Sequence, residues 1–326
     1  MLLKGRDQSL QGNTKQLYNS PIPRTLLAVG SGVVFSSGPD QIRSLVELEP
    51  DHPGFQDPHY RARRNKIAEI AQNYHSGTPV PEADYTDDEH MGWHQILSLL
   101  RPQHEAHVCE PILSLQRTLP LPRHHIPQLN FVNERLKPRT GMRMEPVMGL
   151  VKVRTFLSRL ARGVFPSTQY IRHHSRPLYT PEPDIVHELI GHMASLAHPE
   201  VAEANRWLGR AAIKASEREL VRLEHVYWYV LEFGLCEQRG DIKAVGAGLL
   251  SSAGELSTIA SGPELLDWDL DCIAETPYDP TRTQPSLFVA PSFNRLLSDL
   301  VSWVESGAWR DQDMKKAPRI SAALVR

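Results

Sequence analysis

Two histidines are the residues in this sequence whose spacing most directly suggests chemistry. His187 and His192 lie five residues apart in the segment His-Glu-Leu-Ile-Gly-His. A zinc peptidase needs two histidines four residues apart, which is a rotation of about 40° on an α-helix. A spacing of five gives about 140°, so both rings reach one ion only if the helix is distorted. Because Gly191 permits such a distortion, the spacing disfavours a peptidase but allows a metal site.

Glu232 is the third residue that could bind a metal. It is the only charged residue in the apolar stretch 226–236, where helical spacing predicts a buried helix. A buried carboxylate is costly unless it is paired or bound to a metal. Two histidines and a carboxylate on one side of an ion leave the other side open, which is the arrangement of non-haem Fe(II) oxygenases. Zinc with the same ligands is an alternative.

Structural roles compete with a metal site at each of these positions. A pair of histidines near a helix end is more often structural than metal-binding, and motif matches of this kind are frequently false. Glu232 could instead pair with an arginine such as Arg172, and Glu188 could lie on a solvated helix face. The aromatic residues around Glu232 are more often part of a core than the wall of a pocket.

The helices that would carry these residues have recognisable starts. Thr180 followed by proline predicts the start of a helix that runs through His187 toward His192. Ser216 with Glu219 three residues later forms a capping-box pattern, and apolar residues follow at helical spacing. Other helices are expected from about Asp57, from Asp87 or Asp88, at 156–160 and at 292–304, with a short strand at 168–172. The predicted fold class is therefore mainly α with a few short β-strands.

The composition of the chain excludes several classes of protein and of function. The chain has 326 residues, of which 40% are hydrophobic and 23% charged, so wholesale disorder is excluded. A net charge of −2 gives no reason to expect a nucleic-acid partner. No stretch approaches the roughly 20 apolar residues of a membrane span, and no signal peptide is recognisable. Three scattered cysteines argue against a disulfide framework, so we expect a cytoplasmic protein.

Several ordered blocks of the sequence resemble the catalytic domain of the pterin-dependent aromatic amino acid hydroxylases. This family comprises the phenylalanine, tyrosine and tryptophan hydroxylases. The longest matching blocks are residues 178–192, 227–238 and 246–256, and shorter ones lie at 51–64, 126–129, 168–173 and 288–293. The resemblance implies the fold of that catalytic domain over residues 46–310, preceded by a lead-in at 1–45 and followed by a tail at 311–326. Because the tail lacks a heptad pattern, we expect a monomer or a weak dimer.

The resemblance also implies the cofactors. Fe(II) would be held by His187, His192 and Glu232, and O₂ would react with tetrahydrobiopterin beside it. One oxygen atom would pass to the pterin and the other to the aromatic ring of the substrate. The residues implied for the pterin site are Gly149, Val151, Phe156, Glu188 and Tyr227.

The implied substrate is a free aromatic amino acid. The guanidinium of Arg172 would bind its carboxylate. The other residues implied for this site are Thr180 and Ser251 as hydrogen-bonding groups, with Pro183, Trp228 and Phe233 around the ring. Phenylalanine and tyrosine hydroxylases carry tryptophan at the position of Trp228, which favours conversion of L-phenylalanine to tyrosine.

Several positions depart from the family pattern and leave open which substrate is bound and which position of its ring is hydroxylated. They are Val153, Pro166, the segment 193–196, Glu224 and the loop 278–284. A phenylalanine meta-hydroxylase and a tryptophan hydroxylase therefore remain alternatives, with a zinc metallopeptidase as the alternative from another class. We expect a small-molecule amino acid as the partner, with neither nucleic acid nor membrane.

Overall fold

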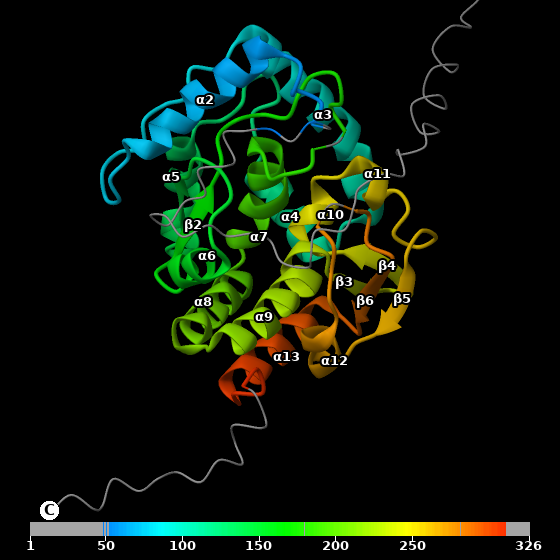
Figure 1. Cartoon of the computed structure of the whole chain (residues 1–326). Coiled ribbons are helices and arrows are strands. Elements are labelled where there is room, and N and C mark those ends of the chain that lie inside the picture. The colour runs from blue at the N-terminus through cyan, green and yellow to red at the C-terminus, as the bar shows by residue number, and fades with distance from the viewer. Residues whose placement is uncertain (1–47, 49, 51, 179, 281, 311–326) are drawn as a thin grey trace, which may run out of the picture. The chain divides into compact units, whose positions relative to one another are not determined.

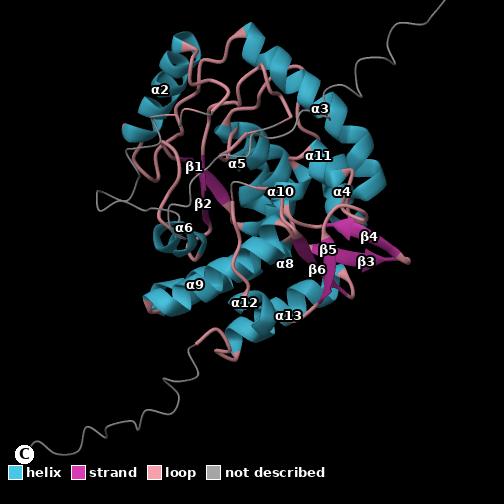
Figure 2. Ribbon diagram, turned by 45° about the vertical axis from the view of Figure 1, so that its right-hand side comes forward, coloured by secondary structure: helices cyan, strands magenta, loops and turns pink. Residues whose placement is uncertain are grey.

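In the computed structural model, the described residues are 48, 50, 52–178, 180–280 and 282–310. The expected lead-in 1–45 and tail 311–326 lie outside them. The described part is mainly helical with a few short strands, which confirms the predicted fold class (Figures 1 and 2). Across these residues, every helix is too short or too polar to cross a membrane.

Helices make up most of the described residues. The longer ones are α2 (Pro58–Gln72), α3 (Asp87–His107), α4 (Glu110–Thr118), α5 (Leu129–Thr140), α6 (Val153–Leu160), α8 (Pro199–Lys214), α9 (Glu217–Val226) and α13 (Phe293–Glu305). The shorter ones are α7 (Ala194–Leu196), α10 (Ala247–Leu250), α11 (Ala253–Leu256) and α12 (Leu270–Glu275). Two π-helical segments, η2 (His187–Met193) and η3 (Tyr227–Glu232), complete the set.

The helix starts follow the capping signals of the sequence. Asp57 caps α2, because its side chain accepts hydrogen bonds from the first backbone N–H groups of that helix. Thr86 at the start of α3 and Ser216 at the start of α9 each form a complete capping box. Ser292 caps α13 in the same way as Asp57 caps α2. These four predicted helices are confirmed, each within one or two residues of its expected start.

The strands form two small sheets. Strands β1 (Arg143–Pro146) and β2 (Val164–Ser167) pair in parallel. The larger sheet has the order β4-β3-β6-β5, and its members are β3 (Leu235–Gln238), β4 (Asp241–Ala244), β5 (Glu264–Asp267) and β6 (Ser286–Ala290). Only β3 and β4 are antiparallel within it. Because β3 begins three residues after η3 ends, this sheet fixes the end of the helix that carries Glu232.

One continuous hydrophobic core connects the helices to the larger sheet. Large side chains such as Trp93, Tyr229 and Phe288 are almost fully buried in it. Helix α8 packs against α6 and α13, and α10 packs against η2. Since η2 and η3 both contribute to this core, their positions are determined by packing from several directions.

Two local predictions were wrong. Residues 168–172 do not form a strand, since β2 ends at Ser167. The backbone N–H groups of Thr168 and Arg172 donate instead to the carboxylates of Glu188 and Asp184, so they need no neighbouring strand.

The helix start predicted at Thr180 is the second of these errors. Its hydroxyl donates to the carbonyl of Glu182, and helical structure begins only at Ile185. The capping group is Asp184, which accepts a hydrogen bond from the backbone N–H of His187.

Candidate iron and pterin site

Two π-helices bring the three predicted metal ligands together. Both histidines belong to η2, and Glu232 is the last residue of η3. Backbone hydrogen bonds in a π-helix join residues five apart, so His187 and His192 project on the same side. The distortion that their spacing requires is therefore spread over the whole of η2.

Gly191 has a packing role in this arrangement. A Cβ atom at this position would lie 2.6 Å from the carbonyl oxygen of Ala247 in α10. Gly246 is equally constrained, because its Cβ would lie 2.3 Å from the carbonyl oxygen of Glu232. Glycine is thus required at both positions for the close approach of α10 to the two π-helices.

The ligand atoms face one another at short distances. The Nε2 atoms of His187 and His192 are 3.0 Å apart. The carboxylate of Glu232 lies 3.5 Å from Nε2 of His187 and 3.2 Å from Nε2 of His192. An ion about 2.1 Å from each ligand atom requires ligand separations of about 3.0 to 3.4 Å, for angles between 90° and 109°. The three side chains therefore fit a divalent ion bound from one side.

The electrostatics of these groups also call for a positive charge between them. All three are buried or nearly so, with side-chain exposures of 15%, 5% and 11% for His187, His192 and Glu232. Burial lowers the pKa of His187 to about 4. Burial also opposes charge on His192 and Glu232, yet each lowers the energy of the other's charged form, so the pKa of His192 is raised and that of Glu232 is lowered. A metal ion would supply the charge that a proton on His192 otherwise provides.

Ser251 orients His187. Its Oγ lies 3.0 Å from Nδ1 of His187 and donates to the carbonyl of Ala247 or Gly248. Because the hydroxyl proton is used in that way, the Nδ1–H of His187 donates to Ser251 and leaves Nε2 unprotonated toward the site. The structure thus places Ser251, predicted as a substrate contact, beside His187, one of the predicted metal ligands.

Glu188 is a second carboxylate close to the ligands. One of its oxygens and the ring nitrogens of His187 and His192 all lie within 4.8 Å of one another. Oε1 accepts hydrogen bonds from the backbone N–H and the hydroxyl of Thr168, which hold the carboxylate beside the ligand set. Burial raises the pKa of Glu188 to about 7. It is only 4% exposed, so the alternative of a solvated helix face is wrong.

Aromatic rings form the wall next to the ligands. Phe156 of α6 contacts Tyr227 and Phe165 edge to face, with ring centroids 5.2 Å and 5.5 Å apart. The ring of Phe165 lies 4.5 Å from that of His192. The predicted pterin residue Phe156 is thus connected to the ligand set through two buried rings. Gly149 and Val151 lie in the segment that leads into α6.

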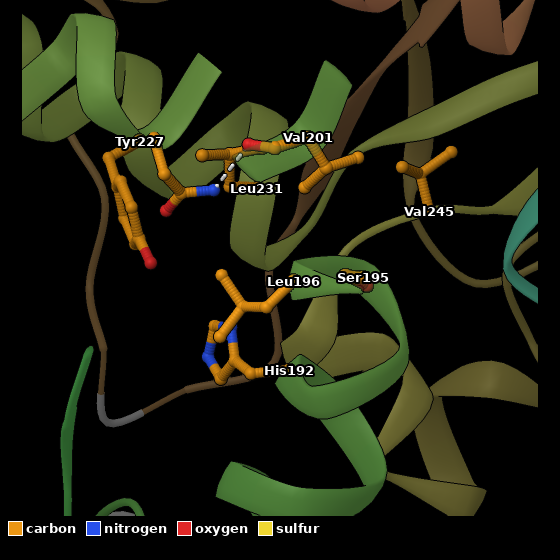
Figure 3. A pocket seen from close by; sticks show the side chains of 8 residues that line it. His192, Ser195, Leu196, Val201, Tyr227, Leu231 and Val245 are labelled. Carbon is orange, nitrogen blue, oxygen red and sulfur yellow. Dashed lines mark hydrogen bonds between the residues drawn. The ribbon is translucent and has the colours of Figure 1, made fainter. Parts of the chain in front are cut away.

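A small pocket lies beside His192 and Tyr227, and apolar side chains make up much of its lining (Figure 3). The hydroxyl of Tyr227 and the side-chain oxygen of Asn205, both in the lining, find no hydrogen-bond partner among the described residues. Buried polar atoms normally have partners, so these two are available to a bound molecule. This observation fits a buried water molecule beside His192, for which the small pocket has room.

Arg172 is held by a buried carboxylate. Its Nε and Nη2 donate to the two oxygens of Asp184 at 2.9 Å and 2.8 Å, and its backbone N–H donates to the same group. The alternative in which Arg172 pairs with Glu232 is therefore wrong. Arg172 holds the pKa of Asp184 below its usual range, although burial opposes this. A guanidinium has five N–H donors, so one edge is still available for a ligand carboxylate.

Two of the remaining predicted substrate residues, Trp228 and Phe233, belong to one aromatic group. Trp228 is packed between Phe233 and Tyr278, whose ring centroids lie 4.7 Å and 4.1 Å from it. The hydroxyl of Tyr278 donates to Glu224 at 2.6 Å. The hydroxyl of Thr180 donates to the carbonyl of Glu182 in its own segment, and the carbonyl oxygen of Pro183 lies 3.2 Å from the hydroxyl oxygen of Thr168.

Four residues that organise the site were not predicted for these roles. Asp184 could have been found, because it lies three residues before His187 at the spacing of a helix cap. Thr168 and Phe165 act on residues about 20 to 30 positions away, and Tyr278 acts on a helix some 50 residues earlier. No local pattern signals such long-range contacts.

Comparisons with known proteins agree with this geometry. A sequence model described as biopterin-dependent aromatic amino acid hydroxylase matches residues 40–315. Tyrosine 3-monooxygenase of Mus musculus is 44% identical over 253 residues, which cover 76% of this chain and 51% of that protein. Phenylalanine-4-hydroxylase of Bos taurus is 44% identical over 256 residues, covering 76% and 56%. The chain thus spans about half the length of these relatives.

Solved structures show the same likeness. Phenylalanine hydroxylase of Chromobacterium violaceum, with bound iron(III) and 7,8-dihydrobiopterin, has a TM-score of 0.67 and 28% identity over 76% of this chain and 90% of that one. The Legionella pneumophila enzyme has a TM-score of 0.66 and 31% identity over 71% and 92%. Family match, fold and ligand geometry lead to one conclusion: this chain belongs to the biopterin-dependent aromatic amino acid hydroxylase family.

Proposed function

We propose that the chain is a monooxygenase that hydroxylates the ring of a free aromatic amino acid, with Fe(II), tetrahydrobiopterin and O₂. The observation that carries this proposal is the set of ligand atoms of His187, His192 and Glu232 at mutual distances of 3.0–3.5 Å, in a chain of this family. Iron and reduced pterin together supply the electrons and the open coordination positions that O₂ activation needs.

The protein side of the reaction is to hold three molecules in contact and to exclude water. His187, His192 and Glu232 hold the metal from one side, and Ser251 fixes the ring of His187. The ring of Phe156 would offer an apolar face to the pterin, and Tyr227 packs against that ring edge to face. Apolar walls keep bulk water away from a reactive oxidant, which would otherwise be lost to side reactions.

Glu188 would bind the edge of the pterin ring. Thr168 fixes its Oε1, so the other oxygen is available to a ring N–H of the pterin. Its pKa of about 7 means that the carboxyl can hold or release a proton near neutral pH. Gly149 and Val151 would add backbone contacts from the segment before α6.

The substrate would be oriented at its two ends. Arg172, fixed by Asp184, offers its free N–H groups to the substrate carboxylate. Pro183, Trp228 and Phe233 would enclose the aromatic ring, with Thr180 nearby. These ring contacts are apolar, which supports L-phenylalanine as the substrate and tyrosine as the product.

Product analysis tests this function. Protein loaded with Fe(II) is given L-phenylalanine, L-tyrosine or L-tryptophan with tetrahydrobiopterin and O₂, and the products are identified by mass spectrometry and NMR. We expect tyrosine from phenylalanine at the highest kcat/KM, and no product when pterin is omitted. Faster hydroxylation of tyrosine or tryptophan would refute the substrate assignment, and product formation without pterin would refute the reaction.

A further inference from the structure

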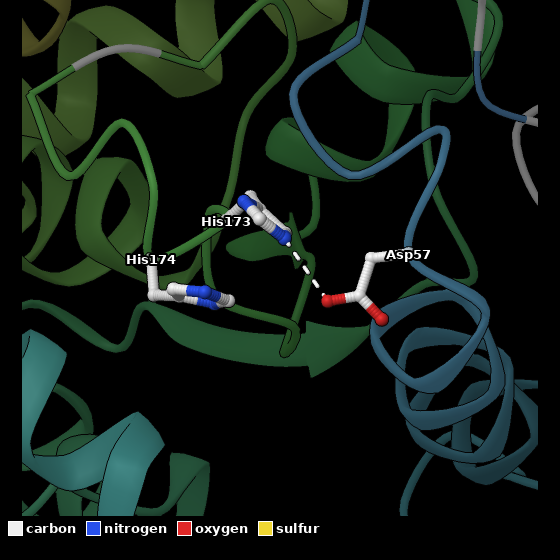
Figure 4. Close-up of side chains that lie close together, drawn as sticks. All are labelled: Asp57, His173 and His174. Carbon is white, nitrogen blue, oxygen red and sulfur yellow. Dashed lines mark hydrogen bonds and ion pairs between the residues drawn. The ribbon is translucent and has the colours of Figure 1, made fainter.

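A second cluster of metal-binding side chains lies outside the site described above. It consists of Asp57, which caps α2, and of the consecutive residues His173 and His174 (Figure 4). One potential ligand atom from each of the three side chains lies within 4.8 Å of the others. Figure 4 shows both imidazole rings directed toward the carboxylate. We call this group the peripheral cluster.

His173 is positioned to act as a ligand through Nε2. This atom lies 3.3 Å from a carboxylate oxygen of Asp57. On the other side of the ring, Nδ1 lies 2.7 Å from the hydroxyl oxygen and 3.2 Å from the backbone N–H of Ser175. The backbone N–H of Ser175 therefore donates to Nδ1, and Nε2–H donates to Oδ2 of Asp57. A metal ion between Nε2 and the carboxylate would take the place of this proton, and Nδ1–H would then donate to the hydroxyl oxygen of Ser175.

The other two proposed ligands, Asp57 and His174, can bind an ion without a large movement. Hydrogen bonds from the backbone of Tyr60 and from His173 lower the pKa of Asp57, so its carboxylate is ionised near neutral pH. Its Oδ1 caps α2, while Oδ2 faces His173. His174 is exposed, and its ring centroid lies 4.2 Å from that of His173, so a small rotation of an unrestrained side chain completes the set.

We propose that Asp57, His173 and His174 bind a divalent transition-metal ion of the zinc class. Two imidazoles and one carboxylate are ligands that suit Zn²⁺, and the exposure of His174 leaves room for water at the fourth position. Hard ions such as Mg²⁺ prefer oxygen ligands and are not expected here. The bound ion would join the start of α2 to the segment that directly follows Arg172.

Metal counting tests the proposal. Protein is dialysed against micromolar free Zn²⁺, and zinc per chain is measured by mass spectrometry of the digested sample. The wild-type chain should bind two ions, one at the central ligand set and one at the peripheral cluster. His174→Ala and Asp57→Asn should each bind one. Asparagine still caps helices well, so Asp57→Asn removes the charged ligand without removing the cap.

Further variants separate this proposal from the proposed enzymatic function. His187→Ala should lose the central ion and keep the peripheral one, and His187→Ala combined with His174→Ala should bind none. His75→Ala, which removes an exposed histidine elsewhere, should still bind two. With Co²⁺ in place of Zn²⁺, the visible absorption of the His187→Ala protein should vanish on adding His174→Ala. Two ions retained in His174→Ala, or no ion retained in His187→Ala, would overturn the peripheral site whatever the enzyme does.

Discussion

The central ligand set and the peripheral cluster contain the same groups, two histidines and one carboxylate each, in different settings. In the central set His187, His192 and Glu232 are nearly buried and come from two π-helices. In the peripheral cluster His174 is exposed, and the side chain of Asp57 is 32% exposed. The two clusters offer a metal ion the same kinds of ligand atom, but water reaches the peripheral cluster more easily than the central set.

This difference determines how strongly each cluster needs an ion. Water can solvate Asp57 and His174, so the peripheral cluster is stable whether or not a metal is bound. The side chains of the central set are at most 15% exposed to water, and burying a carboxylate without a partner is costly. The central set should therefore bind its metal more tightly. Each set includes one serine that orients a histidine, Ser251 for His187 and Ser175 for His173.

The largest effect is expected from Glu232→Gln. This change removes the negative charge of the central set, so we expect a loss of Fe(II) affinity of more than about 100-fold, since even the partners of metal ligands cost about 10- to 100-fold. Hydroxylation should be abolished. Fe(II) binding is measured by anaerobic equilibrium dialysis, and turnover by product formation. Glu237→Gln, an exposed neighbour in β3, is the control. Wild-type turnover in Glu232→Gln would show that the ligand assignment is wrong.

Asp184→Asn should destabilise the fold itself. The variant leaves the buried guanidinium of Arg172 without its carboxylate, for which we expect a loss of about 3–5 kcal/mol in the free energy of unfolding. Urea denaturation measures it. Asp84→Asn removes one partner of the exposed pair Lys66–Asp84 and should change stability by less than about 1 kcal/mol. Equal losses in both variants would contradict the distinction between buried and exposed charges.

The pH dependence of the metal-free protein should reveal Glu188. Its pKa is raised to about 7 by burial, so the folded state binds a proton that the unfolded state releases near the ordinary pKa of 4.5. The carboxyl therefore favours the protonated folded state at low pH, and stability falls as pH rises from 4.5 to 7. Against Glu188→Gln, the wild-type free energy of unfolding should decline by up to about 3 kcal/mol across this window. Parallel pH curves for the two proteins would disprove the raised pKa.

Ser251→Ala should have a smaller effect. Without the hydroxyl, the ring of His187 loses its orientation, and Fe(II) affinity should fall about 10- to 100-fold. Ser175→Ala should also weaken Zn²⁺ binding at the peripheral cluster, because Nδ1–H of the metal-bound His173 loses the hydroxyl oxygen that would accept from it. Calorimetric titration of each metal measures both changes, and Ser257→Ala is an exposed control. An unchanged affinity in Ser251→Ala would exclude the positioning role.

The sequence predicted the elements that depend on local signals. The capping box at Ser216 and the helical patterns that begin near Asp57 and Ser292 needed only nearby residues to be recognised. The isolation of Glu232 and the five-residue spacing of the histidines selected three ligands that the structure brings together. Iron at that point stays a prediction.

Contacts between distant segments could not be predicted. The error at 168–172 arose because Glu188 and Asp184 bind that backbone from another segment, which no alternation of side chains reveals. The five-residue spacing of the histidines predicted a distorted helix near His187, but it did not predict that the whole of η2 is π-helical. The stacking of Tyr278 on Trp228 likewise depends on a fold-wide arrangement.

The most direct test of the central claim is a crystal structure of the Fe(II)-loaded protein with anomalous scattering recorded at the iron edge. We predict that the strongest peak lies about 2.0–2.2 Å from Nε2 of His187, Nε2 of His192 and a carboxylate oxygen of Glu232. A structure with no iron peak at that point, or with iron only at Asp57 and His173, would contradict the account.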